Sequence, residues 1–181
     1  MSLKTDLDKI EKKLKDAIEK LKTPTRLQEI GDFSADLIRK RTRLGYGVDS
    51  TGSEKQKLKP LSDSYKQQRA GKISFITKKA KRGNVIIPIK PKQKPELSES
   101  TTASKSNLTN SGQMLDSIKA KVSTNKVSIK PTGSRKNSLL NNLEVAEFVS
   151  KDRPFNNLSN KEIKQLRDFV AQMLKLITKY L

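Results

Sequence analysis

Hydrophobic residues at the start of the chain recur at alternating intervals of four and three positions. This spacing is typical of a helix that presents one apolar seam to another helix, and the seam consists of Leu3, Leu7, Ile10, Leu14, Ala17 and Leu21. Thr23-Pro24 is expected to end the helix, because proline disfavours helical geometry in the residue before it. Three heptads are marginal alone, so we expect residues 1–22 to form a helical arm that packs either on another subunit or on its own domain.

A second helix is predicted directly after this arm. Thr25 and Gln28 have the spacing of a capping box, and the helix should run to about Arg41 with an apolar face of Leu27, Ile30, Phe33, Leu37 and Ile38. Glycines then break the periodicity, which predicts a loop over residues 43–48. The residues from Lys59 to Tyr65 predict the cap of a short helical turn that ends near Gly71.

The sequence predicts strands in two places. Val85-Ile86-Ile87-Pro88-Ile89 is a short strand candidate, and its proline favours a sheet edge or a bulge. Farther along, apolar residues alternate with polar ones on both sides of Thr124-Asn125, which predicts a β-hairpin; they are Ala120, Val122, Val127 and Ile129. A short helix before this hairpin is expected to begin at Thr109 or Asn110 and to carry Met114, Leu115 and Ile118.

The end of the chain predicts a long amphipathic helix. Ser159 and Glu162 fit a capping box, and the apolar face after them is Ile163, Leu166, Val170, Met173, Leu174 and Ile177. Together these patterns predict an α+β fold with helices packed on a small antiparallel sheet. We expect residues 23–181 to form one domain, from which a mobile basic excursion extends at about 65–107.

Composition changes the picture through charge. The chain has 181 residues, a formal net charge of +20 and 33% hydrophobic residues, which suggests a small core and an anionic partner. Half of the net charge falls in residues 65–95, which contain no acid and ten cations, namely Lys66, Arg69, Lys72, Lys78, Lys79, Lys81, Arg82, Lys90, Lys92 and Lys94. This stretch is either a solvated surface or a surface that binds anions. Few aromatic residues accompany it, so any nucleic-acid contact is expected at phosphates, without sequence preference.

Catalytic chemistry has little support in the sequence. Cysteine and histidine are both absent, which removes thiolate sites and the commonest general base and metal ligand. No glycine-rich phosphate loop is present, and the scattered acid pairs are best explained as solvated helix faces. We therefore expect a protein that is not an enzyme, with no cofactor, no bound metal and no membrane span.

Two short blocks carry a family resemblance. The first runs from Asn107-Leu108-Thr109-Asn110-Ser111-Gly112 to Ile118, and the second is Arg153-Pro154-Phe155, followed by the capped terminal helix. With the hairpin between them, their order resembles the virion morphogenesis group, the tail-completion and head-to-tail joining proteins of tailed bacteriophages. An earlier block formed by Pro60, Leu61, Tyr65 and Arg69 resembles the same family. The resemblance covers residues 26–69 loosely and 106–180 more closely.

The resemblance implies a structural virion protein of the phage neck or tail, made in the host cytoplasm. It implies a cyclic homo-oligomer whose partners are neighbouring neck, portal-adaptor or tail proteins, with non-specific contact to packaged DNA as a further option. Core roles follow for Leu108, Leu115, Ile118, Pro154, Phe155 and Val170. Contact with an anionic partner surface is assigned to Arg69, Lys78, Lys79, Lys81, Arg82 and Arg153. For Arg153 an internal salt bridge is favoured over a contact between subunits.

Two other functions stay open at this point. The lysine-rich stretch also fits a non-specific DNA-binding protein, which would release DNA steeply as salt rises. The seam in residues 3–21 fits a toxin-like or partner-binding helical protein, whose activity would be lost on removal of residues 1–22.

Overall fold

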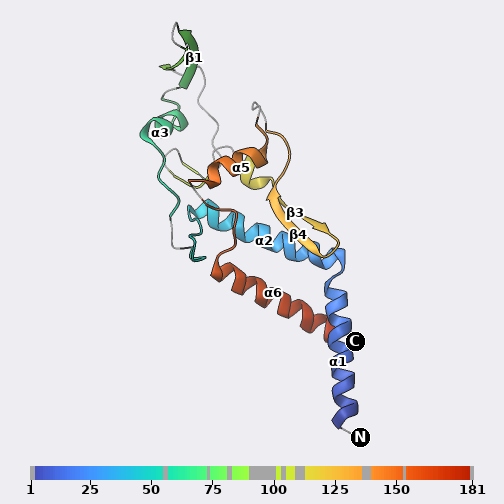
Figure 1. Ribbon diagram of the computed structural model, residues 1–181. Helices are drawn as coiled ribbons and strands as arrows, with labels where there is room; N and C mark the ends of the chain where they lie inside the picture. The colour runs from blue at the N-terminus through green and yellow to red at the C-terminus, as the bar shows by residue number, and fades with distance from the viewer. Residues whose placement is uncertain are drawn as a thin grey trace.

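Helix α2 (Pro24–Leu44) is the element around which the rest of the chain is arranged in the computed structural model (Figure 1). The structure describes residues 3–54, 57–72, 74–80, 83–89, 101–102, 105–108, 113–135, 140–152 and 154–179, with the backbone alone at 3–8, 74–80 and 83–89. One side of α2 packs against the hairpin of β3 (Ile118–Ser123) and β4 (Lys126–Pro131), and α6 (Asn160–Lys179) packs elsewhere along it. The predicted α+β fold is confirmed.

The first two helices begin and end close to the predicted positions. Helix α1 spans Leu3–Leu21, and α2 follows with Pro24 in its first turn and Thr23 as its N-cap. The predicted capping box at Thr25 and Gln28 is wrong, because both residues already lie inside the helix. The Gln28 side chain instead donates to Asp32, at 2.9 Å, and to the carbonyl of Ala120, at 3.3 Å.

The predicted hairpin around Thr124-Asn125 is present as β3 and β4, which pair antiparallel with Val122 opposite Val127. The short helix before it is α4 (Gln113–Asp116), which carries buried Met114 and Leu115. Ile118 was expected on this helix, but it is the first residue of β3. The helix ends after one turn because Ser117 turns the chain into the strand, with its hydroxyl donating to the carbonyl of Met114 at 2.7 Å.

Gly31 lets α2 approach the hairpin closely. A Cβ atom at this position would overlap the Cβ of Ala120 and lie 2.6 Å from Cγ1 of Val127. The side chain of Arg39, farther along α2, donates to the carbonyl of Ile118 at 3.3 Å. The absence of a side chain at Gly31 therefore sets the distance between the helix and the sheet.

We expect Gly31→Ala to lower the free energy of unfolding by about 1–3 kcal/mol, the usual cost of overpacking. In an exposed helix, replacing glycine by alanine would instead raise the free energy of unfolding by about 1 kcal/mol. The sign of the change in stability therefore tests whether Gly31 contacts the hairpin. Urea unfolding of Gly31→Ala, with and without Ala120→Gly, measures it. The loss should shrink when Ala120 is glycine, and a raised unfolding midpoint for the single variant would refute the close approach.

The core is small and lies where α2, α4, β3 and α5 (Asn142–Ser150) meet. Its buried residues are Ala35, Ile38, Met114, Leu115, Ile118, Ala146 and Phe155, and partly buried Leu108, Ile129, Val145, Val149 and Leu158 pack against them. The predicted core positions Leu115, Ile118 and Phe155 are confirmed. Leu108 packs at the margin of the core with a φ of 56°, in the left-handed region.

Two side-chain caps start the last helices. Asn141 and Glu144 form a capping box at the start of α5, which the sequence had shown only as an apolar segment. The predicted box of Ser159 and Glu162 is present at the start of α6, because the Ser159 amide donates to Glu162 at 2.7 Å and the Glu162 amide donates to Ser159 Oγ at 3.2 Å. Val170, predicted for the core, is half-buried on α6, while Phe169 stacks on Phe33 of α2 with ring centroids 4.4 Å apart.

Part of the basic excursion is folded. The predicted turn is α3 (Asp63–Arg69), with Ser62 as its N-cap. The strand expected at 85–89 lies within β2 (Gly83–Ile89), and β1 (Ser74–Ala80), which was not predicted, pairs with it antiparallel. In Figure 1 this β1–β2 hairpin stands well away from α2, at the end of the molecule opposite the N-terminus of α1.

Helix α1 extends from the other end of the molecule. It contacts α6, and Ala17 is fully buried there, whereas its N-terminal half continues beyond the rest of the fold (Figure 1). Of the two packings expected for the arm, contact with its own domain is thus present at the C-terminal half. Among the helices that the structure describes, none has the length and apolarity needed to cross a bilayer.

Candidate functional site

A buried ion pair joins the end of α2 to the start of α6. Arg41 and Glu162 are only 5% and 3% exposed, and Arg41 Nη1 donates to Glu162 Oε2. The other guanidinium nitrogen, Nη2, donates to the carbonyl of Phe155 and, at 3.0 Å, to that of Asn157. One arginine therefore holds α2, the chain around Phe155 and α6 together.

The charge of Arg41 is held in a poorly solvated place. Burial lowers the pKa of Arg41 below its usual value, and the neighbouring carboxylates of Glu162 and Glu54 act in the opposite direction. Among the described residues, the buried atoms Arg41 Nε and Glu162 Oε1 have no hydrogen-bond partner. The ion pair thus depends on both of its members, since either one alone would leave a buried charge uncompensated.

The loop after α2 brings Glu54 to the same place. Asp49 Oδ1 accepts from the amides of Thr51 and Ser53, both at 2.9 Å, and these bonds close the loop into a tight turn. The hydroxyl of Thr51 and the amide of Ser53 hold the pKa of Asp49 below its usual range. Glu54 then accepts from Ser159 Oγ, at 3.1 Å, and pairs with Lys161, also at 3.1 Å.

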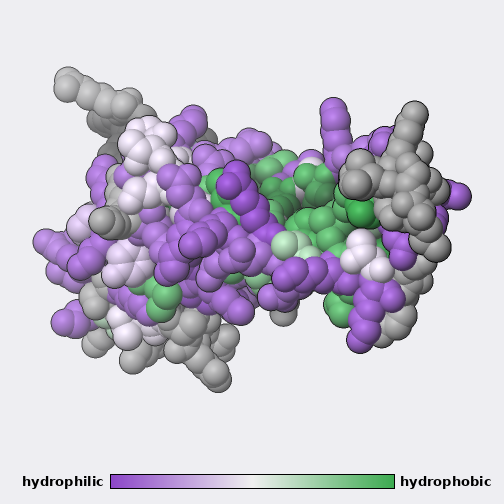
Figure 2. Space-filling model, turned by 90° about the horizontal axis from the view of Figure 1, so that it is seen from below, coloured by the Kyte–Doolittle hydropathy of each residue, from purple (hydrophilic) through white to green (hydrophobic). Residues whose placement is uncertain are grey.

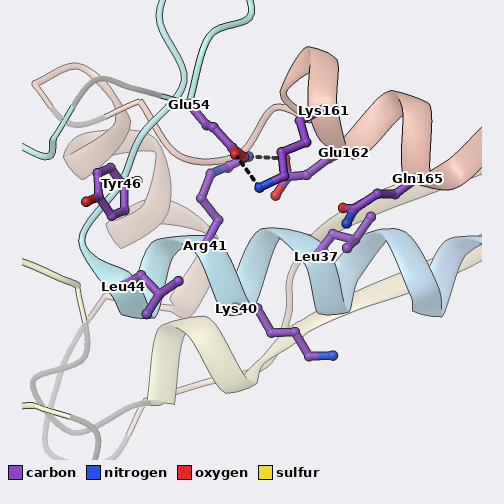
Figure 3. Close-up of a pocket in the computed structure, with 9 residues that line it drawn as sticks. All are labelled: Leu37, Lys40, Arg41, Leu44, Tyr46, Glu54, Lys161, Glu162 and Gln165. Atoms are coloured by element: carbon purple, nitrogen blue, oxygen red, sulfur yellow. Dashed lines mark hydrogen bonds and ion pairs between the residues drawn. The ribbon is translucent and has the colours of Figure 1, made fainter.

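A cleft of about 520 Å³ opens beside these charges, between α2 and α6. Figure 3 shows Arg41 reaching toward Glu54 and Glu162, with Leu37 and Gln165 at one end of the cleft and Leu44 and Tyr46 at the other. Lys40 also lines the cleft but points away from the charge cluster (Figure 3). Apolar walls and a charged, bonded floor suit the docking of a side chain from another protein segment.

The peptide block around Pro154 forms the back of this region. Phe155 fills the core, and the Pro154 carbonyl accepts from the amide of Val48 at 3.1 Å. A Cβ atom at Gly47 would lie 2.5 Å from that carbonyl oxygen, so a glycine is needed for the two chain segments to meet. The predicted burial of Phe155 in the core is confirmed, the turn predicted at Pro154 stays a prediction, and Arg153 lies outside the described residues.

The prediction that Arg69 contacts a partner is wrong. Arg69 is 3% exposed, and its guanidinium donates to the carbonyl of Lys105 at 2.9 Å and to Thr101 Oγ1 at 2.8 Å. Burial lowers the pKa of Arg69, against a smaller opposing effect of Tyr65. Its charge serves the fold, because it ties α3 to the chain that returns from the β1–β2 hairpin.

This return segment was expected to be part of a mobile linker. Its described residues are instead bonded to the fold: Thr101 Oγ1 donates to Asn107 Oδ1 at 2.7 Å, and Asn107 Nδ2 donates to the carbonyl of Arg43 at 3.0 Å. Ser106 Oγ donates to the carbonyl of Lys59 at 2.6 Å. The described residues of this segment, 101–102 and 105–108, are therefore held against the fold.

The other predicted contact residues are placed only in part. Lys78 and Lys79 lie on β1, opposite Val85 and Asn84 of β2, at positions where the structure describes the backbone alone. Lys81 and Arg82 lie outside the described residues. The structure thus puts two predicted cations on the projecting hairpin and removes Arg69 from the candidate surface.

Sequence reasoning missed Arg41 and Glu54. Arg41 continues the apolar stripe of α2, three residues after Ile38, and a lone cation on such a stripe is the signal of a buried partner elsewhere. Among the described residues, no group of three or more His, Cys, Asp or Glu side chains could hold a metal ion. Comparisons with protein-family models, with curated proteins and with solved structures each found no match for this chain.

Proposed function

We propose that the protein is a structural virion component of a tailed bacteriophage, a head-to-tail connector or tail-completion protein that assembles as a ring. The observation that carries the proposal is a small core with appendages at both ends. The chain exposes 13141 Å², whereas a compact protein of 20.4 kDa exposes about 8,800 Å². Surface in such excess is expected of a subunit that is completed by its neighbours.

The order of the folded elements supports the same proposal. The turn of α4, the β3–β4 hairpin, the Pro154-Phe155 block and the capped helix α6 follow one another in the order that the family resemblance implies. The cleft between α2 and α6 and the β1–β2 hairpin add two places where a neighbour can dock. The net charge of +20 favours neighbours with acidic surfaces, because equal charges within a ring repel.

The mass of the purified protein, measured by light scattering with and without duplex DNA, tests the proposal. We expect a discrete multimer at moderate salt whose mass DNA does not change. A monomer that coats DNA and releases it steeply with salt would overturn the proposal and support a DNA-binding protein.

A pair of variants tests whether DNA binding depends on the lysines of the β1–β2 hairpin or only on the net charge of the protein. If the hairpin contacts phosphates, Lys78→Gln/Lys79→Gln should lower the slope of log affinity against log salt by about two. The matched control, Lys119→Gln/Lys121→Gln, removes the same charge from exposed positions of β3. We expect both variants to bind DNA weakly and equally, and to keep the multimer mass of the wild type. If only Lys78→Gln/Lys79→Gln lowered the salt slope of DNA affinity, the result would contradict the role as a connector and support DNA binding by the hairpin.

A further inference from the structure

Helix α1 carries an apolar stripe that the described fold leaves uncovered. Ile10, Leu14 and Ile18 are 55%, 53% and 45% exposed, and their spacing of four residues puts them on one face of the helix. Seen from below, the hydrophobic surface gathers on the right of the molecule, where α1 and the end of α6 lie (Figure 2). Leu176 of α6 is also exposed, at 59%.

The seam of α1 is only partly used within the subunit. Its C-terminal half packs against α6, where Ala17 is fully buried. Ile10 and Leu14 belong to the same seam, and the described residues of this subunit leave more than half of each side chain exposed. Helices with such a repeat pack against other helices. We therefore expect the exposed N-terminal half of α1 to pack against a helix from another chain.

We propose that this helix is α1 of a second copy, packed antiparallel across a two-fold axis at Leu14. In this register Leu14 meets Leu14 of the partner subunit, and Ile10 meets Ile18 of the partner subunit. The three exposed side chains of one subunit then cover the same three side chains of the other. This is the self-complementarity that a two-fold contact requires.

Charge favours a second copy at this helix. The sequence of α1 contains six lysines and five acidic residues, a net charge of +1, whereas the whole chain carries +20. Two copies of α1 therefore repel each other weakly, although the chains as wholes repel strongly.

Charge also favours the antiparallel orientation, through the charge outside α1. Glu11 and Lys15 lie on one flank of the stripe, where they form an ion pair of 2.6 Å, and Lys13 lies on the other flank; with 3.6 residues per turn, these charges make as many attractive as repulsive contacts in either orientation. The rest of each chain carries a net charge of +19, which is +20 less the +1 of α1, and it follows the C-terminal end of α1. Antiparallel pairing puts these two positive parts at opposite ends of the helix pair, whereas parallel pairing puts them at the same end, where they repel more strongly.

This contact is distinct from the one that closes a ring. A two-fold contact joins two chains and cannot add a third chain through the same surface. It therefore either pairs subunits within one ring or joins two rings. The proposed contact is inferred from the exposed stripe and the charges of α1, and it does not depend on the formation of a ring.

Cross-linking tests the register, because the chain contains no cysteine. We expect Leu14→Cys to cross-link to itself through a short bismaleimide. An equimolar mixture of Ile10→Cys and Ile18→Cys, with one of them tagged, should give mainly the mixed dimer. Lys12→Cys, exposed on the opposite face of α1, is the control and should stay uncross-linked. Self-linked Ile10→Cys as the main product, or equal linking of the control, would overturn the proposal.

The mass in solution tests the energetics. Leu14→Gln should lower the mass of the wild-type species, to one half where the contact joins two rings and to a small fragment where it lies within one ring, and Lys12→Gln should leave the mass unchanged. Glu11→Lys should weaken the association, and adding Lys15→Glu should restore it, because the exchanged charges again alternate across the axis. An unchanged mass for Leu14→Gln refutes the α1 pair and leaves the ring in place, whereas a wild-type dimer that Leu14→Gln converts to monomer supports the pair and refutes the ring.

Discussion

Arg41→Met is expected to lower the free energy of unfolding by about 3–5 kcal/mol, the usual cost of removing one partner from a buried ion pair. The substitution keeps an unbranched side chain as far as the position of Nε but leaves the carboxylate of Glu162 buried and without its ion-pair partner. It also removes the donors to the carbonyls of Phe155 and Asn157. Urea unfolding followed by circular dichroism measures the loss.

Two companion variants show whether the unpaired charge is the cause. Arg41→Met/Glu162→Gln should recover a large part of the loss, because glutamine is neutral and still accepts from the Ser159 amide. Arg26→Met removes the arginine of a half-exposed pair with Glu29, at 2.8 Å, and should cost no more than about 1 kcal/mol. Equal losses for Arg41→Met and Arg26→Met would show that the buried pair contributes no more than a surface pair does.

Phe155→Ala is expected to cost about 3–5 kcal/mol, the usual range for removing a buried aromatic side chain. Phe155 is fully buried among Ile38, Leu115 and the other core residues, and so small a core has few residues that can move into the space. Phe148→Ala is the matched control, because Phe148 on α5 is 74% exposed and its removal should change stability by less than about 0.5 kcal/mol.

The comparison of the two phenylalanines also tests the packing itself. Both variants remove the same atoms, so a difference in the urea midpoint reports burial alone. Similar losses at both positions would mean that Phe148 is covered in solution, and concentration-dependent unfolding of the wild type would then identify the cover as another subunit.

Local patterns in the sequence predicted the elements whose structure is set locally. The 3.6-residue periodicity of α1 and α6, the alternation around Thr124-Asn125 and the box of Ser159 and Glu162 all depend on residues close in the chain. The box at Thr25 failed for an equally local reason, since Pro24 takes the first turn of α2 and puts Thr25 inside the helix.

The misses concern contacts between distant parts of the chain. Arg69 and Arg41 look alike in sequence, as cations in basic surroundings, and both proved to be buried. Their partners lie 36 and 121 residues away, and no periodicity connects such positions. The exposed cations Lys40 and Lys119 lie in similarly basic stretches of the sequence. Only the tertiary structure therefore distinguishes a buried cation that stabilises the fold from an exposed one.

The separation of Arg41 from Glu162 has a consequence for how the chain is made. At about 5–20 residues per second, the 121 residues from Thr42 to Glu162 take the ribosome roughly 6–24 s to add. During that interval α2 has neither its buried carboxylate nor Phe155, and the nascent chain exposes the face that both later cover. Folding of the core therefore waits until the start of α6 has been synthesised, and chaperones that bind exposed apolar segments have several seconds to act on the nascent chain.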